Sequence, residues 1–115
     1  MMAKLLTVPE LISLAAENVR RVDAATAKSL RCENPGTLID VREPMEVQQQ
    51  PTRDSINVPR GVLEMKIAGL CPDSDAVIYI HCATGGRATL AAEQLQRMGY
   101  RQVTVLACKA EELRD

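Results

Sequence analysis

The amino-acid sequence predicts an α/β domain in which a small central parallel sheet of about five strands carries helices on both faces. Short apolar runs alternate along the chain with segments whose apolar residues follow helical spacing, which is typical of strand–helix–strand units. The runs at residues 37–41 and 76–80 are apolar at mostly consecutive positions, as expected for strands covered on both sides. A chain of 115 residues is long enough for one core. We therefore predict a single domain over residues 1–115, with residues 1–18 as an N-terminal helical extension.

Composition narrows the class of protein. Hydrophobic residues make up 46% of the chain and aromatic residues only 2%, so Leu, Ile, Val, Ala and Met must build the core. The formal net charge of −1 gives no indication of nucleic-acid binding. We recognise no membrane-spanning run and no signal peptide, and we expect a reducing, cytoplasmic setting. With one histidine and no C-x-x-C pair, we expect no metal site and no cofactor.

The first half of the chain carries clear helix-capping signals. Thr7 and Glu10 form the pattern of a capping box, and Asp23 is a typical N-cap residue. Asn34-Pro35-Gly36 is a turn sequence that ends the second helix. The expected elements are, in order, a helix from residue 8 to about 18, a strand at 19–22, a helix at 24–31 and a strand at 37–41.

The second half alternates in the same way. Its expected elements are a short helix from residue 46 that frays towards 53, a strand at 55–58, a helix at 61–68, a strand at 76–80, a helix from about 87 to 98, a strand at 102–106 and a short polar helix at 109–114. Leu63, Met65 and Ile67 are the candidates for the inner face of the helix at 61–68. Gly99 is suited to the C-terminal end of the long helix.

The segment His81-Cys82-Ala83-Thr84-Gly85-Gly86-Arg87-Ala88 joins the strand at 76–80 to the long helix. A cysteine ends the strand, two glycines form a tight loop and an arginine opens the helix. This order directs backbone N–H groups and the positive end of a helix dipole at the thiol. Because such surroundings stabilise a thiolate and bind anions, we predict that Cys82 is a nucleophile. A buried packing cysteine is the alternative.

Polar residues also follow the strand at 37–41. Asp40-Val41-Arg42-Glu43-Pro44 stands at its C-terminal end, and ligands bind at this edge of open α/β sheets. From these residues alone, an ordinary surface turn is equally favoured. His81 adjoins Cys82, but strand alternation turns it to the opposite face, so we predict a structural histidine rather than a catalytic base. We expect the other cysteines, Cys32, Cys71 and Cys108, to be packing thiols without disulfides.

Four segments resemble, in the right order, the single-domain rhodaneses, a family of sulfurtransferases. They are Leu38-Ile39-Asp40-Val41-Arg42-Glu43, Ile56-Asn57-Val58-Pro59-Arg60-Gly61, His81 to Ala88, and Met98-Gly99-Tyr100 with Val103. The resemblance covers roughly residues 19–106 and implies the rhodanese-like fold. The chain departs from the family twice. Residues 51–55 replace a His-Ile-Pro-Gly-Ala type segment, and Cys108-Lys109 stands where the family has two glycines followed by a tryptophan.

The resemblance implies a sulfurtransferase of the thiosulfate type. Such enzymes take a sulfane sulfur from a donor such as thiosulfate onto the catalytic cysteine, here Cys82. They pass it from the persulfide to a thiophilic acceptor such as cyanide, a thiol or a sulfur-carrier protein. The residues expected to bind the donor and the transferred sulfur are Ala83, Thr84, Gly85, Gly86, Arg87 and Arg42. Asp40 is expected to brace the loop. We expect a monomer that binds neither nucleic acid nor membranes.

Two other functions remain open. Phosphatases and arsenate reductases of the Cys-loop-Arg type also bind an oxyanion with loop amides and an arginine. Their loops place about five residues between Cys and Arg, whereas only Ala83 to Gly86 separate Cys82 from Arg87. A non-catalytic rhodanese-fold module for binding or regulation is the other alternative, because the C-terminal family motif is missing. Cys108 is a candidate for an additional role at the site: at the same edge of the sheet as Cys82, it could act as a resolving thiol that forms a disulfide with Cys82.

Overall fold

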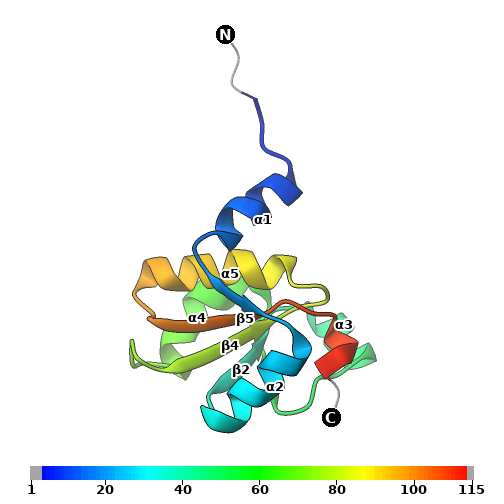
Figure 1. The fold of residues 1–115 in the computed structure, drawn as a ribbon, viewed down its shortest axis with the longest axis vertical. Helices are drawn as coiled ribbons and strands as arrows, with labels where there is room; N and C mark the ends of the chain where they lie inside the picture. Colours follow the sequence, from blue (N-terminus) through cyan, green and yellow to red (C-terminus); the bar gives the residue numbers. More distant parts are fainter. Residues whose placement is uncertain (1–3, 114–115) are drawn as a thin grey trace.

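The computed structural model describes residues 4–113, and its centre is a sheet of five parallel strands in the order β1-β5-β4-β2-β3 (Figure 1). In chain order the elements are α1 (Val8–Ala16), β1 (Arg20–Val22), α2 (Ala24–Glu33), β2 (Thr37–Asp40), α3 (Pro44–Gln49), β3 (Ser55–Asn57), the 3₁₀ helix η1 (Arg60–Val62), α4 (Leu63–Leu70), β4 (Val77–His81), α5 (Gly86–Met98), β5 (Gln102–Leu106) and the 3₁₀ helix η2 (Ala110–Leu113). The predicted fold class is confirmed.

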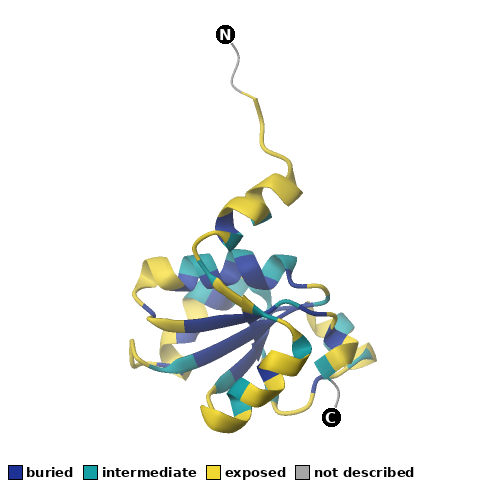
Figure 2. Cartoon of the chain, viewed as in Figure 1, coloured by how far each residue is buried: buried dark blue, intermediate teal, exposed yellow. Residues whose placement is uncertain are grey.

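Helices cover the sheet on both faces. The helices α4 and α5 lie on one face, and α2 lies on the other (Figure 1). Alternation along β2 and β4 sends Ile39 and Ile80 to the α5 face, and it sends Leu38 and Tyr79 to the α2 face. The central strands are therefore buried over most of their length (Figure 2). Small residues on the inner side of α5 allow it to pack closely on the sheet: Ala88, Ala91 and Ala92.

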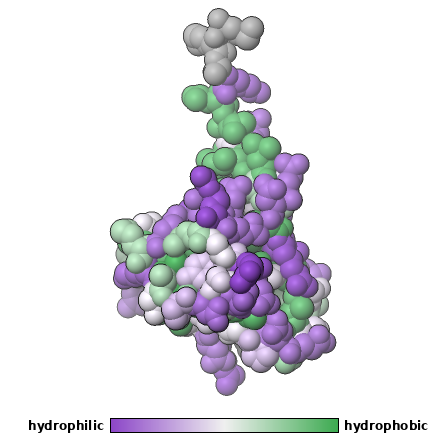
Figure 3. Space-filling model, turned by 90° about the vertical axis from the view of Figure 1, so that its left-hand side faces the viewer, coloured by the Kyte–Doolittle hydropathy of each residue, from purple (hydrophilic) through white to green (hydrophobic). Residues whose placement is uncertain are grey.

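The first helix packs mainly on α5 (Figure 1). Ile12 of α1 reaches the first residue of α5, because its Cδ1 lies 3.0 Å from the position that a Cβ on Gly86 would occupy. The outer side of this segment keeps apolar side chains in solvent, and Figure 3 shows them gathered along the N-terminal arm. They are Leu5, Leu6, Val8, Leu11 and Leu14. Within residues 4–113, neither α1 nor any other helix is long and apolar enough to cross a membrane.

The structure differs from the predicted elements at several places; one is the helix predicted at 61–68, which is observed as η1 (Arg60–Val62) followed by α4 (Leu63–Leu70). The third helix begins at Pro44 rather than Glu46, because Glu43 and Glu46 form a capping box at its start. Met65 is 77% exposed, so its predicted inward orientation is wrong; the buried stripe of α4 runs through Leu63 and Ile67 at i, i+4 spacing. The short polar helix predicted at 109–114 is observed as the 3₁₀ helix η2, and position 114 of the predicted range lies outside the described residues.

We predict that Gly36→Ala destabilises the fold by about 1–3 kcal/mol, the usual cost of overpacking a closed site. A Cβ atom at Gly36, just before β2, would collide with the carbonyl oxygen and side chain of Val77 at the start of β4. Gly61→Ala is the matched control, because nothing lies within 4 Å of the added atom. It should stay within about 1 kcal/mol of the wild type. Urea unfolding followed by circular dichroism measures both variants, and equal stability of the two would contradict the close approach of β2 and β4.

Candidate active site

The loop of residues 82–85 joins β4 to α5 at the C-terminal edge of the sheet. Gly85 is the N-cap of α5 and has a φ of 105°, in the left-handed region that side chains rarely adopt. A Cβ on Gly85 would also lie 3.3 Å from the Cα of Ala107, just after β5. Glycine at this position therefore satisfies both a backbone conformation and a close approach of two chain segments.

The thiol of Cys82 lies at the focus of the loop. Its Sγ accepts hydrogen bonds from the backbone N–H groups of Gly85, at 3.1 Å, and Ala88, at 3.4 Å. Cys82 is only 1% exposed, whereas Thr84 in the same loop is exposed. Two N–H donors at the N-terminus of a helix favour negative charge on the sulfur.

Two loop carbonyl groups are fixed by neighbouring donors. The carbonyl oxygen of Gly85 accepts hydrogen bonds from the backbone N–H and the hydroxyl of Thr89, at 2.9 Å and 2.7 Å. The carbonyl oxygen of Ala83 accepts one from the N–H of Ala110 at 3.0 Å. The C-terminal segment thus supports the loop although Cys108-Lys109 stands where the related family has glycines. These bonds fix the backbone on either side of Gly85, whose own N–H donates to the Cys82 sulfur.

Arg87 lies on the first turn of α5 and forms an ion pair with a residue of α3. Its Nη1 and Nη2 atoms donate to the two carboxylate oxygens of Glu46, at 2.7 Å and 2.8 Å. Hydrogen bonding to Arg87 is the largest cause that lowers the pKa of Glu46 to about 2. The same bond raises the pKa of Arg87. Both side chains are 38% exposed, so this planar, bidentate pair lies at the protein surface beside the loop.

Arg42 and Asp40 form a second ion pair, and it is buried. Asp40 is fully buried and Arg42 is 2% exposed. The Nε and Nη2 atoms of Arg42 donate to the Asp40 carboxylate, with a shortest distance of 2.7 Å. Nη2 also donates to the carbonyl oxygen of Gln50 at the end of α3. The guanidinium predicted to bind a donor is therefore engaged inside the protein, where it ties β2 to α3.

His81 ends β4 and lies opposite Asp40 in the register of β2 and β4. Cys82 belongs to the core cluster on the α5 face, while the preceding alternation places His81 on the α2 face, as predicted. Burial lowers the pKa of His81, so the ring is neutral at pH 7. Its Nε2 lies 3.6 Å from Asp40 Oδ2, and neither ring nitrogen has a hydrogen-bond partner. Among the described residues, no three His, Cys, Asp or Glu side chains are grouped as metal ligands.

Arg21 is a residue near the loop that sequence reasoning missed. Its Nη2 atom lies 3.7 Å from the position that a Cβ on Gly85 would occupy. The side chain is exposed, and within residues 4–113 it enters no ion pair. Its position depends on β1 pairing with β5, the last strand of the chain. No local signal in the sequence indicates this long-range pairing.

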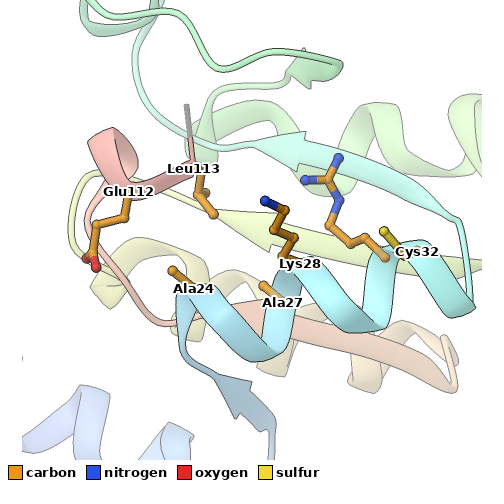
Figure 4. A pocket seen from close by; sticks show the side chains of 7 residues that line it. Ala24, Ala27, Lys28, Cys32, Glu112 and Leu113 are labelled. Atoms are coloured by element: carbon orange, nitrogen blue, oxygen red, sulfur yellow. The ribbon is translucent and has the colours of Figure 1, made fainter. Parts of the chain in front are cut away.

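The other cysteines are free thiols with different surroundings. Cys108 is buried, and burial is the largest cause that raises its pKa, which disfavours it as an attacking thiolate. Cys32 is exposed, so the prediction that it is a packing thiol is wrong. It lines a pocket of about 350 Å³ between α2 and η2, next to Lys28 (Figure 4). No residue of the loop at 82–85 lines this pocket.

We predict that Glu46→Gln lowers stability at neutral pH but not at low pH. The folded-state pKa of Glu46, about 2, lies below the ordinary value of 4.5. The carboxylate therefore stabilises the fold above about pH 5, and this contribution disappears as the pH falls towards 2. Because the pair is part-exposed, the difference at pH 7 should be at most about 1 kcal/mol. Urea unfolding from pH 7 to pH 3 measures it. A difference that does not change with pH would contradict the assignment.

The control for this experiment is Glu93→Gln at pH 7. Glu93 is half-buried like Glu46 and lies on α5, the helix that carries Arg87, but it forms no ion pair within the described part of the chain. Removing its charge should change the unfolding free energy by no more than about 0.5 kcal/mol.

Comparisons with known proteins agree with the fold. A sulfurtransferase from Allochromatium vinosum is 32% identical over 66 residues, which are 57% of this chain and 60% of that protein. A solved rhodanese from E. coli, determined with anions, is 32% identical, with a TM-score of 0.61, over 66% of this chain and 88% of that chain. This chain thus spans only about 60% of the length of the sulfurtransferase that it matches.

A further solved structure shares the fold over a larger part of the chain. It is a protein of unknown function from Rhodopseudomonas palustris, described as a possible tyrosine phosphatase, with a TM-score of 0.80, 23% identity and coverage of 95% of this chain and 91% of that one. At this identity the likeness concerns the fold alone. The model of one family, the rhodanese-like domain, matches residues 23–112, from the N-cap of α2 to η2. With the strand order, the loop and this match in agreement, the chain belongs to the rhodanese-like domain family.

Proposed function

We propose that this protein is a sulfurtransferase that carries a sulfane sulfur on Cys82 as a persulfide. The observation that carries the proposal is the position of Cys82 Sγ, which accepts hydrogen bonds from the N–H groups of Gly85 and Ala88 at the N-terminus of α5. Negative charge on sulfur is required both in the attacking thiolate and in the persulfide. Backbone donors fixed before the reaction stabilise this charge without reorganisation.

The proposed reaction has two steps, here with thiosulfate as the donor. The thiolate of Cys82 attacks the outer sulfur, so that a new S–S bond forms, and the bond between the two thiosulfate sulfurs breaks. Sulfite leaves with the electron pair of that bond. A thiophilic acceptor such as cyanide then attacks the terminal sulfur of the persulfide, forms thiocyanate and returns the thiolate of Cys82. A thiol or a sulfur-carrier protein would accept the sulfur in the same manner.

The loop residues have distinct roles in this proposal. The N–H groups of Gly85 and Ala88 hold Sγ, and the remaining amides from Ala83 to Arg87 line the space for the terminal sulfur. Arg87 positions the first turn of α5 through Glu46. Asp40 braces this region through Arg42 and the end of α3, rather than by a hydrogen bond of its own to the loop.

Hydrolysis of phosphate esters is less well supported. With four residues between Cys82 and Arg87 the loop is short for a tetrahedral phosphoryl group, and a single sulfur atom needs less room. The guanidinium of Arg87 is also paired with Glu46, so it is not available to a bound oxyanion while that pair is intact.

We predict that thiosulfate adds the mass of one sulfur atom to Cys82 and that cyanide removes it with formation of thiocyanate. Intact-protein and peptide mass spectrometry locate the adduct, and a colorimetric assay measures thiocyanate. Cys82→Ser should lose the adduct and lower turnover by about 10³-fold or more, because the nucleophile is absent. Cys32→Ser is the matched control: it removes the exposed thiol and should keep full transfer.

Three outcomes would count against the proposal. A folded wild type without an adduct would favour a non-catalytic binding module. Release of phosphate from an aryl phosphate without persulfide formation would favour a phosphatase. Retained transfer in Cys82→Ser would remove Cys82 from its role.

A further inference from the structure

Neither arginine that the sequence assigned to donor binding is free in the structure. Arg42 is 2% exposed and bonded to Asp40, and Arg87 is paired through both terminal nitrogens with Glu46. Sulfane sulfur donors such as thiosulfate carry anionic oxygens next to the sulfur that is transferred. When the outer sulfur meets Cys82, the anionic group lies at least one S–S bond, about 2 Å, further out. A cation that receives this group without breaking either ion pair therefore comes from another element near the loop.

Arg21 is suited to this position by its place in the sheet. It pairs in register with Val105, and Val105 belongs to the core cluster on the α5 face. Side chains of register partners in a parallel sheet point to the same face. The Arg21 guanidinium extends along this face to Gly85, where Nη2 lies 3.7 Å from the position of a Cβ. Gly85 is the residue whose N–H donates to the Cys82 sulfur.

We infer that Arg21 binds the anionic group of the sulfur donor and thereby directs this site to oxyanion-bearing donors. The inference rests on the proposed sulfur transfer through Cys82. A guanidinium presents paired N–H donors that match the oxygens of a sulfonate or carboxylate. Arg21 is exposed and enters no ion pair with another described residue, so no carboxylate of residues 4–113 has to be displaced. It also lies outside the residues matched by the family model, which begin at Asp23.

Arg20 provides a control of the same type and charge on the same strand. It pairs in register with Thr104, and the strand alternation directs it to the α2 face. There it lines a groove with Tyr79 and Thr104, away from the loop. Arg20 is exposed and, like Arg21, has no ion-pair partner among residues 4–113. Substituting either arginine with alanine removes one positive charge. A difference in rate between the two variants therefore comes from the position of the guanidinium and not from the change in net charge.

The test is the rate of persulfide formation on Cys82 in a single turnover. Wild type, Arg21→Ala, Arg21→Lys and Arg20→Ala are mixed with increasing thiosulfate, quenched and measured by mass spectrometry. The second-order rate constant should fall about tenfold in Arg21→Ala, as expected for loss of a charge-assisted hydrogen bond, and less in Arg21→Lys. Arg20→Ala should stay within about twofold of the wild type. The dependence of the rate on salt should be weaker in Arg21→Ala than in the wild type.

A second measurement separates donor binding from a structural effect. Discharge of the preformed persulfide to dithiothreitol, an acceptor without an oxyanionic group, should have the same rate in Arg21→Ala and in the wild type. Equal persulfide formation in Arg21→Ala and wild type, or an equal loss in Arg20→Ala and Arg21→Ala, would overturn the role of Arg21 while sulfur transfer stands. Equal losses in formation and discharge would assign Arg21 to loop structure and also overturn it. Absence of any persulfide in the wild type would overturn the proposed function itself.

Discussion

The buried ion pair of Asp40 and Arg42 is the interaction on which the surroundings of the loop depend. Both side chains are almost completely removed from solvent, and such a pair is tolerated only when its hydrogen-bonding groups are satisfied. The Nε and Nη2 atoms of Arg42 meet this condition by bonding to Asp40 and to the end of α3. With α3 held against β2, Glu46 lies where it pairs with Arg87 on α5. Two ion pairs in succession thus connect the end of β2 to the helix that begins at the active loop.

In this arrangement the backbone and the side chains have different roles. The backbone N–H groups of Gly85 and Ala88 contact the sulfur of Cys82, while Arg42 and Arg87 stabilise the frame around the loop. Backbone donors are held by the start of α5 and by the Thr89 and Ala110 contacts, so they do not depend on flexible side chains. Because both arginines are engaged in this way, the proposed cation for an anionic donor is Arg21, whose exposed guanidinium lies close to Gly85.

The C-terminal segment shows how a changed motif can keep its structural task. The chain has Cys108 and Lys109 where the resemblance leads one to expect glycines, yet the N–H of Ala110 still donates to the carbonyl oxygen of Ala83. Cys108 is buried, and the pKa of its thiol is raised mainly by that burial. The thiol consequently stays protonated at neutral pH, which makes it a packing group beside the site and a poor partner for disulfide exchange with Cys82.

The sequence by itself determined the features that depend on neighbours along the chain. These are the caps at Thr7 and Asp23, the alternation of strands and helices, and the order strand, Cys82, two glycines and helix. Only the tertiary structure decided how the charged residues pair. Arg87 and Glu46 are 41 residues apart, and Arg21 reaches Gly85 because β1 lies beside β5. Local propensity acts over a few residues, whereas these contacts arise when distant strands and helices pack. The sequence therefore does not show that Arg87 is paired with Glu46, nor that Arg21 lies near the loop.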